Sequence, residues 1–437
     1  MNETKAHMKT KNNTLDKVKA GLQRRRAAEM RFRALGLVSI VAALSFLLIL
    51  LTSIVTTAIP AFTRTMVALD VYFDPQNITP DSGDNNKAQS LASGNYDACI
   101  KAALATAFPD VRDRQQKRAL NALISSSAAY QLRDMVLENP KLIGQTKAVW
   151  VLADDNVDQV LKGSISRDIP EAERKLKNNQ LLWIDKLVAD GKIKTTFNAA
   201  FFTSGDSREP ESSGILSALS GSFLTLLVTL SLSLPIGIAA AIYLEEFAPR
   251  NRWTDFIEVN INNLAAVPSI VFGLLGLAVF INVMGLPRSS SLVGGLILTL
   301  MTMPVIIIAA RSALKSVPPS VRDAALGVGA SPIQAVFHHV FPLAMPGILT
   351  GAIIGMSRAL GESAPLLMIG MVAFIMDIPH NIRDPATVLP VQIYLWADSP
   401  ERAFVERTAA AILVLLFFLV CMNGLAVYLR KTYEQRW

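Results

Sequence analysis

Cysteine, histidine and charge are all scarce in this chain of 437 residues. The two cysteines, Cys99 and Cys421, exclude a disulfide framework, and four histidines leave little material for a His/Cys metal site. Charged residues make up 18% of the chain, whereas roughly a quarter is usual in a soluble protein. Hydrophobic residues make up 51% and gather in runs, which rules out a wholly soluble or disordered chain.

The usual signatures of enzymes are missing as well. The sequence has no GxxxxGK[ST] phosphate loop, and it lacks the HExxH, GxSxG, CxxC and GxGxxG motifs. We therefore predict no ATP site, no catalytic residue, no cofactor and no metal ligand. Asp154 and Asp155 are adjacent carboxylates, but neighbouring residues do not share one face of a helix or strand, so we expect a solvated turn there.

Six apolar stretches are long enough to cross a bilayer core, which takes roughly 20 helical residues. They run approximately over residues 34–59, 215–244, 256–284, 291–310, 346–376 and 409–429. Ten Lys or Arg residues precede the first stretch against three acidic ones, and basic residues also close the chain. Because positive segments stay in the cytoplasm, we predict a multi-pass protein with both termini cytoplasmic and an uncleaved first anchor. We expect the basic tail to orient the chain and not to bind nucleic acid.

Residues 60–213 then lie outside the membrane on the far side, with 19 basic and 20 acidic residues. About 150 residues suffice for one globular domain with its own core. Its pattern predicts a mixed α/β domain with strands at 65–73, 147–152 and 192–202 and a helical stretch at 111–138. Residues 81–86 and 204–214 are rich in Gly, Ser, Asp and Asn, and we expect them to be exposed loops.

The loop between the fourth and fifth crossings, residues 311–345, predicts two short helices. Ser320 to Asp323 has the pattern of a capping box, and Gly329 suits the end of the first helix. A second capping box begins at Ser331 with Pro332 at the first helical position, and we expect that helix to end at Pro342. Local physics leaves two alternatives open, a plain linker and an interaction element.

The same loop resembles a family signature. Asp323-Ala324-Ala325, then Gly329, then the segment from His339 to Pro342 resemble the EAA loop of ABC importer permeases, EAA-x3-G-x9-I-x-L-P, with matching spacing. Asp323 replaces Glu, His339 replaces Ile and Phe341 replaces Leu. The resemblance implies that Asp323, Ala324, Ala325, Gly329 and Pro342 belong to a loop that docks into the ATPase subunit.

Other segments are similar to the PstA-type permease subunits of phosphate ABC importers. They are YLEE at 243–246, LAAVPS at 264–269, PVII at 304–307 and RALGESAPLL at 358–367. The resemblance implies inorganic phosphate as substrate. It also implies three protein partners: a PstC-like second permease, a PstB-like ATPase dimer and a PstS-like extracytoplasmic binding protein. Another oxyanion remains the alternative substrate, and a membrane sensor is the distant alternative function.

A charged pair lies in the predicted fifth crossing. At 100° per residue, Gly347, Gly351, Gly355, Arg358 and Glu362 share one arc of about 80°, so we expect this stripe to face protein. Unpaired charges at the bilayer centre cost roughly 2.5 to 3.5 kcal/mol each, so both must be paired or face water. Either the pair locks helix packing, or Arg358 binds the anion and Glu362 orients it.

We therefore predict an all-α polytopic membrane protein of the bacterial inner membrane, with six transmembrane helices of the ABC importer permease type and an inserted extracytoplasmic α/β domain. The predicted divisions are a basic cytoplasmic tail at 1–33, a first crossing at 34–59, the extracytoplasmic domain at 60–213, a permease domain at 214–429 and a cytoplasmic end at 430–437. The predicted pathway residues are Arg358 and Glu362. Membrane lipid surrounds the chain, and nucleic acid is not an expected partner.

Overall fold

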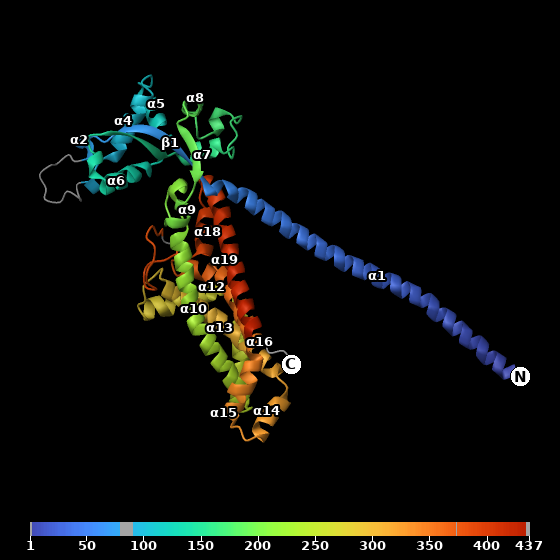
Figure 1. The fold of residues 1–437 in the computed structure, drawn as a ribbon. Helices are drawn as coiled ribbons and strands as arrows, with labels where there is room; N and C mark the ends of the chain where they lie inside the picture. The colour runs from blue at the N-terminus through green and yellow to red at the C-terminus, as the bar shows by residue number, and fades with distance from the viewer. Residues whose placement is uncertain (1, 79–90, 373, 434–437) are drawn as a thin grey trace. The chain divides into compact units, whose positions relative to one another are not determined.

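The computed structural model describes residues 2–78, 91–372 and 374–433, so the predicted loop at 81–86 lies outside the described residues. The chain forms two compact units, Met1–Thr56 and Thr57–Trp437. The first unit is formed by helix α1, Asn2–Ala58, whose last two residues belong to the second unit (Figure 1). The helical run Arg25–Phe62 is long and apolar enough to cross a membrane, and it contains the predicted first crossing.

An antiparallel sheet of three strands begins the second unit. The strands are β1 (Thr63–Tyr72), β2 (Thr146–Leu152) and β3 (Ile193–Phe197), in the order β2-β1-β3. The first two predicted strands are confirmed. The third is shorter than predicted because Asn198 turns the chain: its side chain accepts a hydrogen bond from the Phe201 amide, and Ala200–Thr203 forms the short helix α9.

Helices pack around this sheet to complete an α/β region, residues 63–203. They are α2 (Pro75–Ile78), α4 (Tyr96–Ala107), α5 (Arg114–Asn121), α6 (Ala128–Glu138), α7 (Asp155–Leu161) and α8 (Asn178–Ala189). The predicted helix at 111–138 is split into α5 and α6. It breaks because the Ser125 amide donates to the Leu152 carbonyl and Ile124 bridges to Ala153, so this segment pairs with the end of β2.

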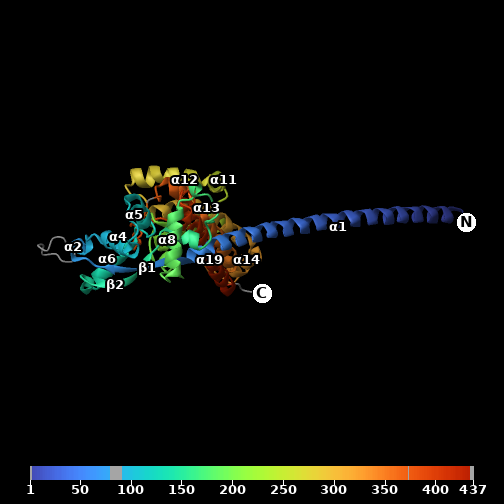
Figure 2. The same cartoon turned by 90° about the horizontal axis from the view of Figure 1, so that it is seen from above.

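Long apolar helices make up the rest of the unit (Figures 1 and 2). They are α10 (Leu216–Ile242), α13 (Ser291–Ser316), α16 (Phe341–Gly361) and α19 (Ala403–Tyr433). With α1, five helices in the described part of the chain are long and apolar enough to cross a membrane. A bent pair raises the number to six if it is counted as one span.

The bent pair occupies the predicted third crossing. Helices α11 (Arg252–Ala265) and α12 (Ser269–Gly276), the latter continued by a π-helical segment to Val283, meet at 101°. The predicted crossing at 256–284 is therefore present as two helices that meet at a sharp bend. Pro268 explains the break, because proline cannot donate a backbone hydrogen bond and forces the residue before it out of helical geometry.

The predicted fifth crossing is displaced toward the N-terminus. Helix α16 ends at Gly361, and only the short α17 (Ala364–Met368) follows within the predicted range. The helix also does not end at Pro342: α15 (Pro332–Ala335), a π-helical turn over Val336–Val340 and α16 form one continuous run. Pro342 lies in the first turn of α16, where its missing amide hydrogen is tolerated.

Helix α13 packs closely against α16 through the predicted glycine stripe. A Cβ atom added to Gly351 would lie 2.2 Å from the Ala309 Cβ, and one added to Gly347 would lie 2.6 Å from the Ala313 Cβ. Neither methyl group fits, so the two backbones approach as only glycine and alanine allow. The prediction that this stripe faces protein is confirmed for Gly347 and Gly351.

Candidate functional site

The loop that resembles the EAA signature forms a helix, a turn and a second helix. Helix α14, Pro319–Gly327, is followed by Gly329 with a φ of 92°, whose amide donates to the Leu326 carbonyl at 3.0 Å. Only glycine adopts this left-handed conformation without strain, so the predicted role of Gly329 in the turn is confirmed. The Ser331 capping box is also present: Gln334 N donates to Ser331 Oγ at 3.3 Å, and Ser331 N donates to Gln334 Oε1 at 2.9 Å.

The first predicted capping box does not form. Helix α14 begins at Pro319 with Pro318 as its N-cap, so Ser320 already lies within the helix and caps nothing. The two prolines set the start instead, because their fixed φ suits the first turn of a helix. Asp323 and Ala324 are exposed, and Ala325 is buried against the helices.

The helix-turn-helix loop carries apolar side chains in solvent. Val328 is 86% exposed and Ile333 61% exposed, and Leu326 and Phe337 are exposed nearby. Exposed apolar groups that gather on one protrusion mark a surface for another protein. We call Leu326, Val328, Ile333 and Phe337 the loop face.

A cluster of charged residues connects this loop to the helices, and sequence reasoning missed it. Arg311 on α13 lies 3.0 Å from the Glu258 carboxylate and 3.4 Å from the Glu245 carboxylate, and Lys315 lies 3.6 Å from Glu245. The same cluster contains Arg322 of α14 and Glu246, whose charged atoms meet directly. We call Glu245, Glu246, Glu258, Arg311, Lys315 and Arg322 the loop cluster. Its two adjacent glutamates in the YLEE segment were the available sequence signal.

Arg358 and Glu362 do meet, but not as two residues of one helix. Arg358 lies in the last turn of α16, whereas Glu362 is the first residue beyond it, with a φ of −82° and a ψ of 121°. The calculated helical arc therefore holds for the glycines and Arg358 and fails for Glu362. Arg358 Nε lies 3.7 Å from Glu362 Oε1, too long for a hydrogen bond, and the two side chains are 45% and 21% exposed.

Glu362 borders a small cavity whose lining is mostly apolar but includes two hydroxyl groups. Hydroxyl-bearing Ser222 and Thr225 of α10 line it together with Leu298 of α13 and Val388. Ser222 Oγ accepts a hydrogen bond from the Leu389 amide at 2.8 Å, and the Thr225 side chain is buried. Two hydroxyl-bearing residues of α10 therefore lie near Glu362 at the end of α16.

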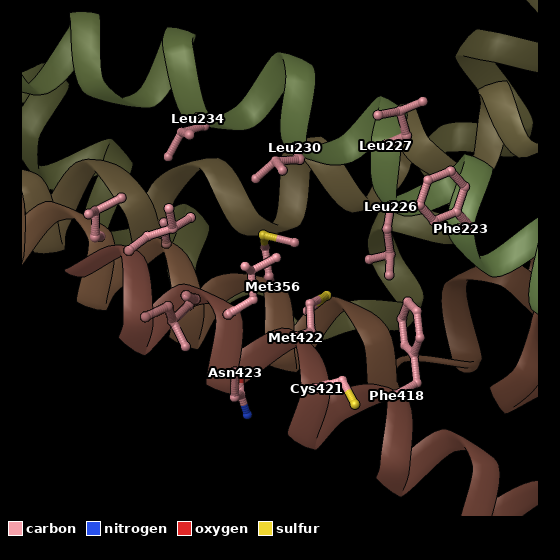
Figure 3. Close-up of a pocket in the computed structure, with 16 residues that line it drawn as sticks. Phe223, Leu226, Leu227, Leu230, Leu234, Met356, Phe418, Cys421, Met422 and Asn423 are labelled. Carbon is pink, nitrogen blue, oxygen red and sulfur yellow. The ribbon is translucent and has the colours of Figure 1, made fainter. Parts of the chain in front are cut away.

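A larger pocket of about 480 Å³ lies between α10, α16 and α19 (Figure 3). No charged side chain lines it, and Figure 3 shows leucine, methionine and phenylalanine side chains around it. Arg358 is not among its lining residues, although its neighbour Ser357 donates to Asn423 Oδ1 of α19 at 2.7 Å. The pocket is therefore unsuited to an inorganic anion.

A second group of charges lies where the α/β region meets the helices. Arg407 of α19 is 3% exposed and donates to the carbonyls of Ala61 at 3.2 Å and Glu211 at 3.4 Å. The Glu211 side chain is 3% exposed, and its burial raises the pKa of that carboxyl to about 8. Burial, together with the charge of Asp154, also raises the pKa of Asp155 to about 7.

Two sequence predictions fail at this junction. The segment 204–214 is not an exposed loop, because Asp206, Glu211 and Ser213 are buried in it. Asp154 and Asp155 do not form a solvated turn: Asp154 caps α7, and Asp155 is largely buried. The polar composition of these segments predicted that they are exposed to solvent. Instead, the residues lie where the α/β region meets the helices. We call Asp155, Glu211 and Arg407 the junction cluster.

Comparison with known proteins places this arrangement in a family. Residues 233–435 match the model described as binding-protein-dependent transport system inner membrane component. A probable ABC transporter permease protein, YqgI of Bacillus subtilis (strain 168), is 32% identical over 244 residues, which are 52% of this chain and 82% of that protein. The chain belongs to the binding-protein-dependent ABC transporter permeases. This permease is therefore a multi-pass membrane protein and not an enzyme.

Other relatives of the permease are named for phosphate transport. The phosphate transport system permease protein PstA of Mycobacterium leprae (strain TN) is 29% identical over 290 residues, which are 62% of this chain and 93% of that protein. PstA 1 of Mycobacterium tuberculosis (strain CDC 1551 / Oshkosh) is 31% identical over 260 residues, 59% of this chain and 83% of that protein. Residues 19–171 match a domain of unknown function, DUF3333. Permeases of this family assemble with ATPase subunits and binding proteins.

Proposed function

We propose that this permease forms half of an ATP-driven pathway that imports inorganic phosphate across the bacterial inner membrane. The observation that carries the proposal is Arg358: its guanidinium lies at the end of a membrane helix, 45% exposed, with only a 3.7 Å contact to Glu362. A loosely held guanidinium in this position can exchange Glu362 for a phosphate oxygen and bind it with two parallel hydrogen bonds. The relatives named PstA support phosphate over another oxyanion, which is the second candidate.

Glu362 has a defined role in this proposal. Between substrates, its carboxylate neutralises Arg358, which would otherwise be costly at membrane depth. When the anion binds, Glu362 can remain beside the hydroxyl-bearing residues Ser222 and Thr225. Arg358 therefore recognises the substrate, and Glu362 holds it ready.

The proposed assembly has four kinds of subunit. A PstC-like permease completes the pathway, and a PstS-like protein delivers phosphate from outside. Of the two PstB-like ATPases, one docks on the loop from Asp323 to Pro342 of this permease, and the exposed Val328 and Ile333 of the loop face provide its contact. In this arrangement both termini and residues 311–345 are cytoplasmic, and residues 60–213 are extracytoplasmic.

Uptake of labelled phosphate tests the substrate. Vesicles that carry the full complex should accumulate phosphate when ATP is supplied, and excess sulfate should not compete. Vesicles that lack this permease provide the control. Uptake that sulfate abolishes, or uptake of sulfate in place of phosphate, would identify the other oxyanion as substrate.

The charge pair separates the two roles considered for Arg358. Arg358→Met combined with Glu362→Gln removes both charges at similar size. If the pair only locks packing, the double variant should transport, because a buried ion pair can be exchanged for apolar groups at little cost. We expect it to assemble and not transport, with Arg358→Lys partly active and the exposed Arg288→Met unaffected. Substantial uptake by the double variant would show that the pair only stabilises helix packing.

A further inference from the structure

Arg322 of the loop makes four hydrogen bonds that bring three elements together. Its Nε donates to Glu246 Oε2 at 3.0 Å, and its Nη2 donates to Glu246 Oε1 at 2.5 Å. Its Nη1 donates to the Val317 carbonyl at 2.9 Å, and Nη2 also donates to the Leu314 carbonyl at 3.0 Å. The guanidinium thus joins α14, the end of α13 and the segment that closes α10.

Each of these contacts has a clear physical cause. The carboxylate accepts both donors of one edge of the guanidinium, the geometry that arginine and carboxylates favour. Leu314 and Val317 lie at the C-terminal end of α13, where carbonyls lack helical partners and the helix dipole attracts a positive charge. The Glu246 side chain is 8% exposed and that of Arg322 is 23% exposed, so water does not replace these bonds easily.

Glu246 connects the loop to a helix that reaches the candidate pathway. It lies in the π-helical segment Tyr243–Phe247, which continues α10. About 21 residues earlier on this helix run, a rise of roughly 32 Å, Thr225 lines the cavity beside Glu362. A displacement of the loop that pulls on Glu246 therefore acts directly on the helix that borders the charged pair.

We propose that Arg322 and Glu246 are a positioning pair that transmits movement of the ATPase-docking loop to α10. The inference rests on the proposed docking function of that loop and adds the route by which docking reaches the pathway. Neither residue belongs to the loop face, so the pair acts after the ATPase has bound. Glu245 does not replace Glu246, because it is engaged by Arg311 and Lys315.

The test uses Arg322→Gln, Glu246→Gln and the double variant in the full complex. Arg250→Gln is the matched control, since this arginine is exposed and makes no ion pair among the described residues. We expect both single variants to bind the ATPase and hydrolyse ATP, and transport per ATP to fall roughly tenfold, because hydrogen bonds between charged groups contribute enough for such a factor. If the two residues act as one unit, transport per ATP in the double variant should be no lower than in either single variant.

A second measurement does not depend on the substrate. Cys421 is exposed in the wall of the pocket between α10, α16 and α19, whereas Cys99 is buried. The rate at which a small maleimide labels Cys421 should change when ATP is trapped in the wild-type complex, and this change should disappear in the Glu246→Gln complex. Full transport per ATP and an unchanged ATP response in well-assembled Glu246→Gln would overturn the proposal. If the wild type responds to ATP, Glu246→Gln loses that response and the wild type transports no phosphate, the proposed substrate fails and the positioning pair stands.

Discussion

The junction cluster and the loop cluster both attach a polar segment to the membrane helices, and they do so with opposite chemistry. At the junction, Arg407 donates to backbone carbonyls, and no ion pair joins Glu211 to a basic side chain among the described residues. In the loop, Arg322 binds the carboxylate of Glu246 through two of its nitrogens. The same side chain type is therefore held by neutral groups in one cluster and by a charged group in the other.

This difference determines how each cluster responds to pH. Burial without a basic partner raises the pKa of Glu211 to about 8, so its carboxyl is mostly protonated at neutral pH. The hydrogen bonds that Arg322 donates to Glu246 raise the pKa of Arg322 above its usual value, so this arginine stays charged. The comparison teaches that burial alone makes an attachment sensitive to alkali, whereas burial with a charged partner does not.

The largest expected effect is a loss of stability of the α/β region in alkali. The folded pKa of Glu211, about 8, is raised above the ordinary 4.5, so its stabilising contribution is complete below pH 4.5 and lost as the pH rises through 8. A shift of this size corresponds to on the order of 5 kcal/mol, and Asp155 adds to it in the same direction. Protease cleavage of the α/β region should therefore accelerate between pH 6 and pH 9 by the linkage relation.

Glu211→Gln sharpens this comparison, because glutamine is neutral at every pH. The variant should keep its resistance to protease in alkali, apart from the contribution of Asp155. Glu209→Gln, two positions away, serves as the control and should behave as wild type. A Glu211→Gln protein with the wild-type alkaline loss would show that another group causes it.

Removing the guanidinium at the junction should have the next largest effect. Arg407→Met leaves the buried carbonyl of Glu211 without this donor and removes the cation that lies 5.8 Å from the Phe201 ring centre. We expect a loss of about 2 kcal/mol, because hydrogen bonds that involve a charged group contribute about 1.5 to 3 kcal/mol. A lowered midpoint of thermal unfolding in detergent would show it, and exposed Arg402→Met should leave the midpoint unchanged.

The smallest effect on stability should come from the loop turn. Gly329→Val forces a branched residue into a left-handed conformation and should cost about 1 to 2 kcal/mol locally. Because nothing lies within 4 Å of the added Cβ at Gly329 or at Gly327, Gly327→Val is a control that differs in backbone conformation. Gly329→Val should insert normally but lose ATPase binding or transport, whereas Gly327→Val should retain both. Normal uptake by Gly329→Val would argue against docking at this turn.

The sequence predicted the parts of the fold that depend on local composition. The apolar runs located α10, α13 and α19, and the alternating pattern located β1 and β2. The prediction from sequence failed where contacts between distant segments determine the structure. Ser204 to Gly214 reads as a polar linker, yet Trp396 Nε1 donates to Asp206 Oδ1 at 3.0 Å from nearly 200 residues away.

The candidate site shows the same division. The sequence predicted Gly329 and the Ser331 cap, because both follow from the backbone geometry of a few adjacent residues. It paired Arg358 with Glu362 but assumed one continuous helix, and α16 ends between them. Arg322 and Glu246 are 76 positions apart, so no local spacing could pair them.

The glycine and alanine contacts of α13 also decide where the membrane region can deform. At Gly347 and Gly351 only the Cβ atoms of Ala313 and Ala309 lie between the two helices, so α13 and α16 pack with little room to rearrange. Flexing is then easier at points where helical hydrogen bonds are already interrupted. The break at Pro268 and the end of α16 at Gly361 are such points, and the second lies directly beside Arg358. When α13 and α16 move together, their displacement therefore reaches the end of α16 beside Arg358.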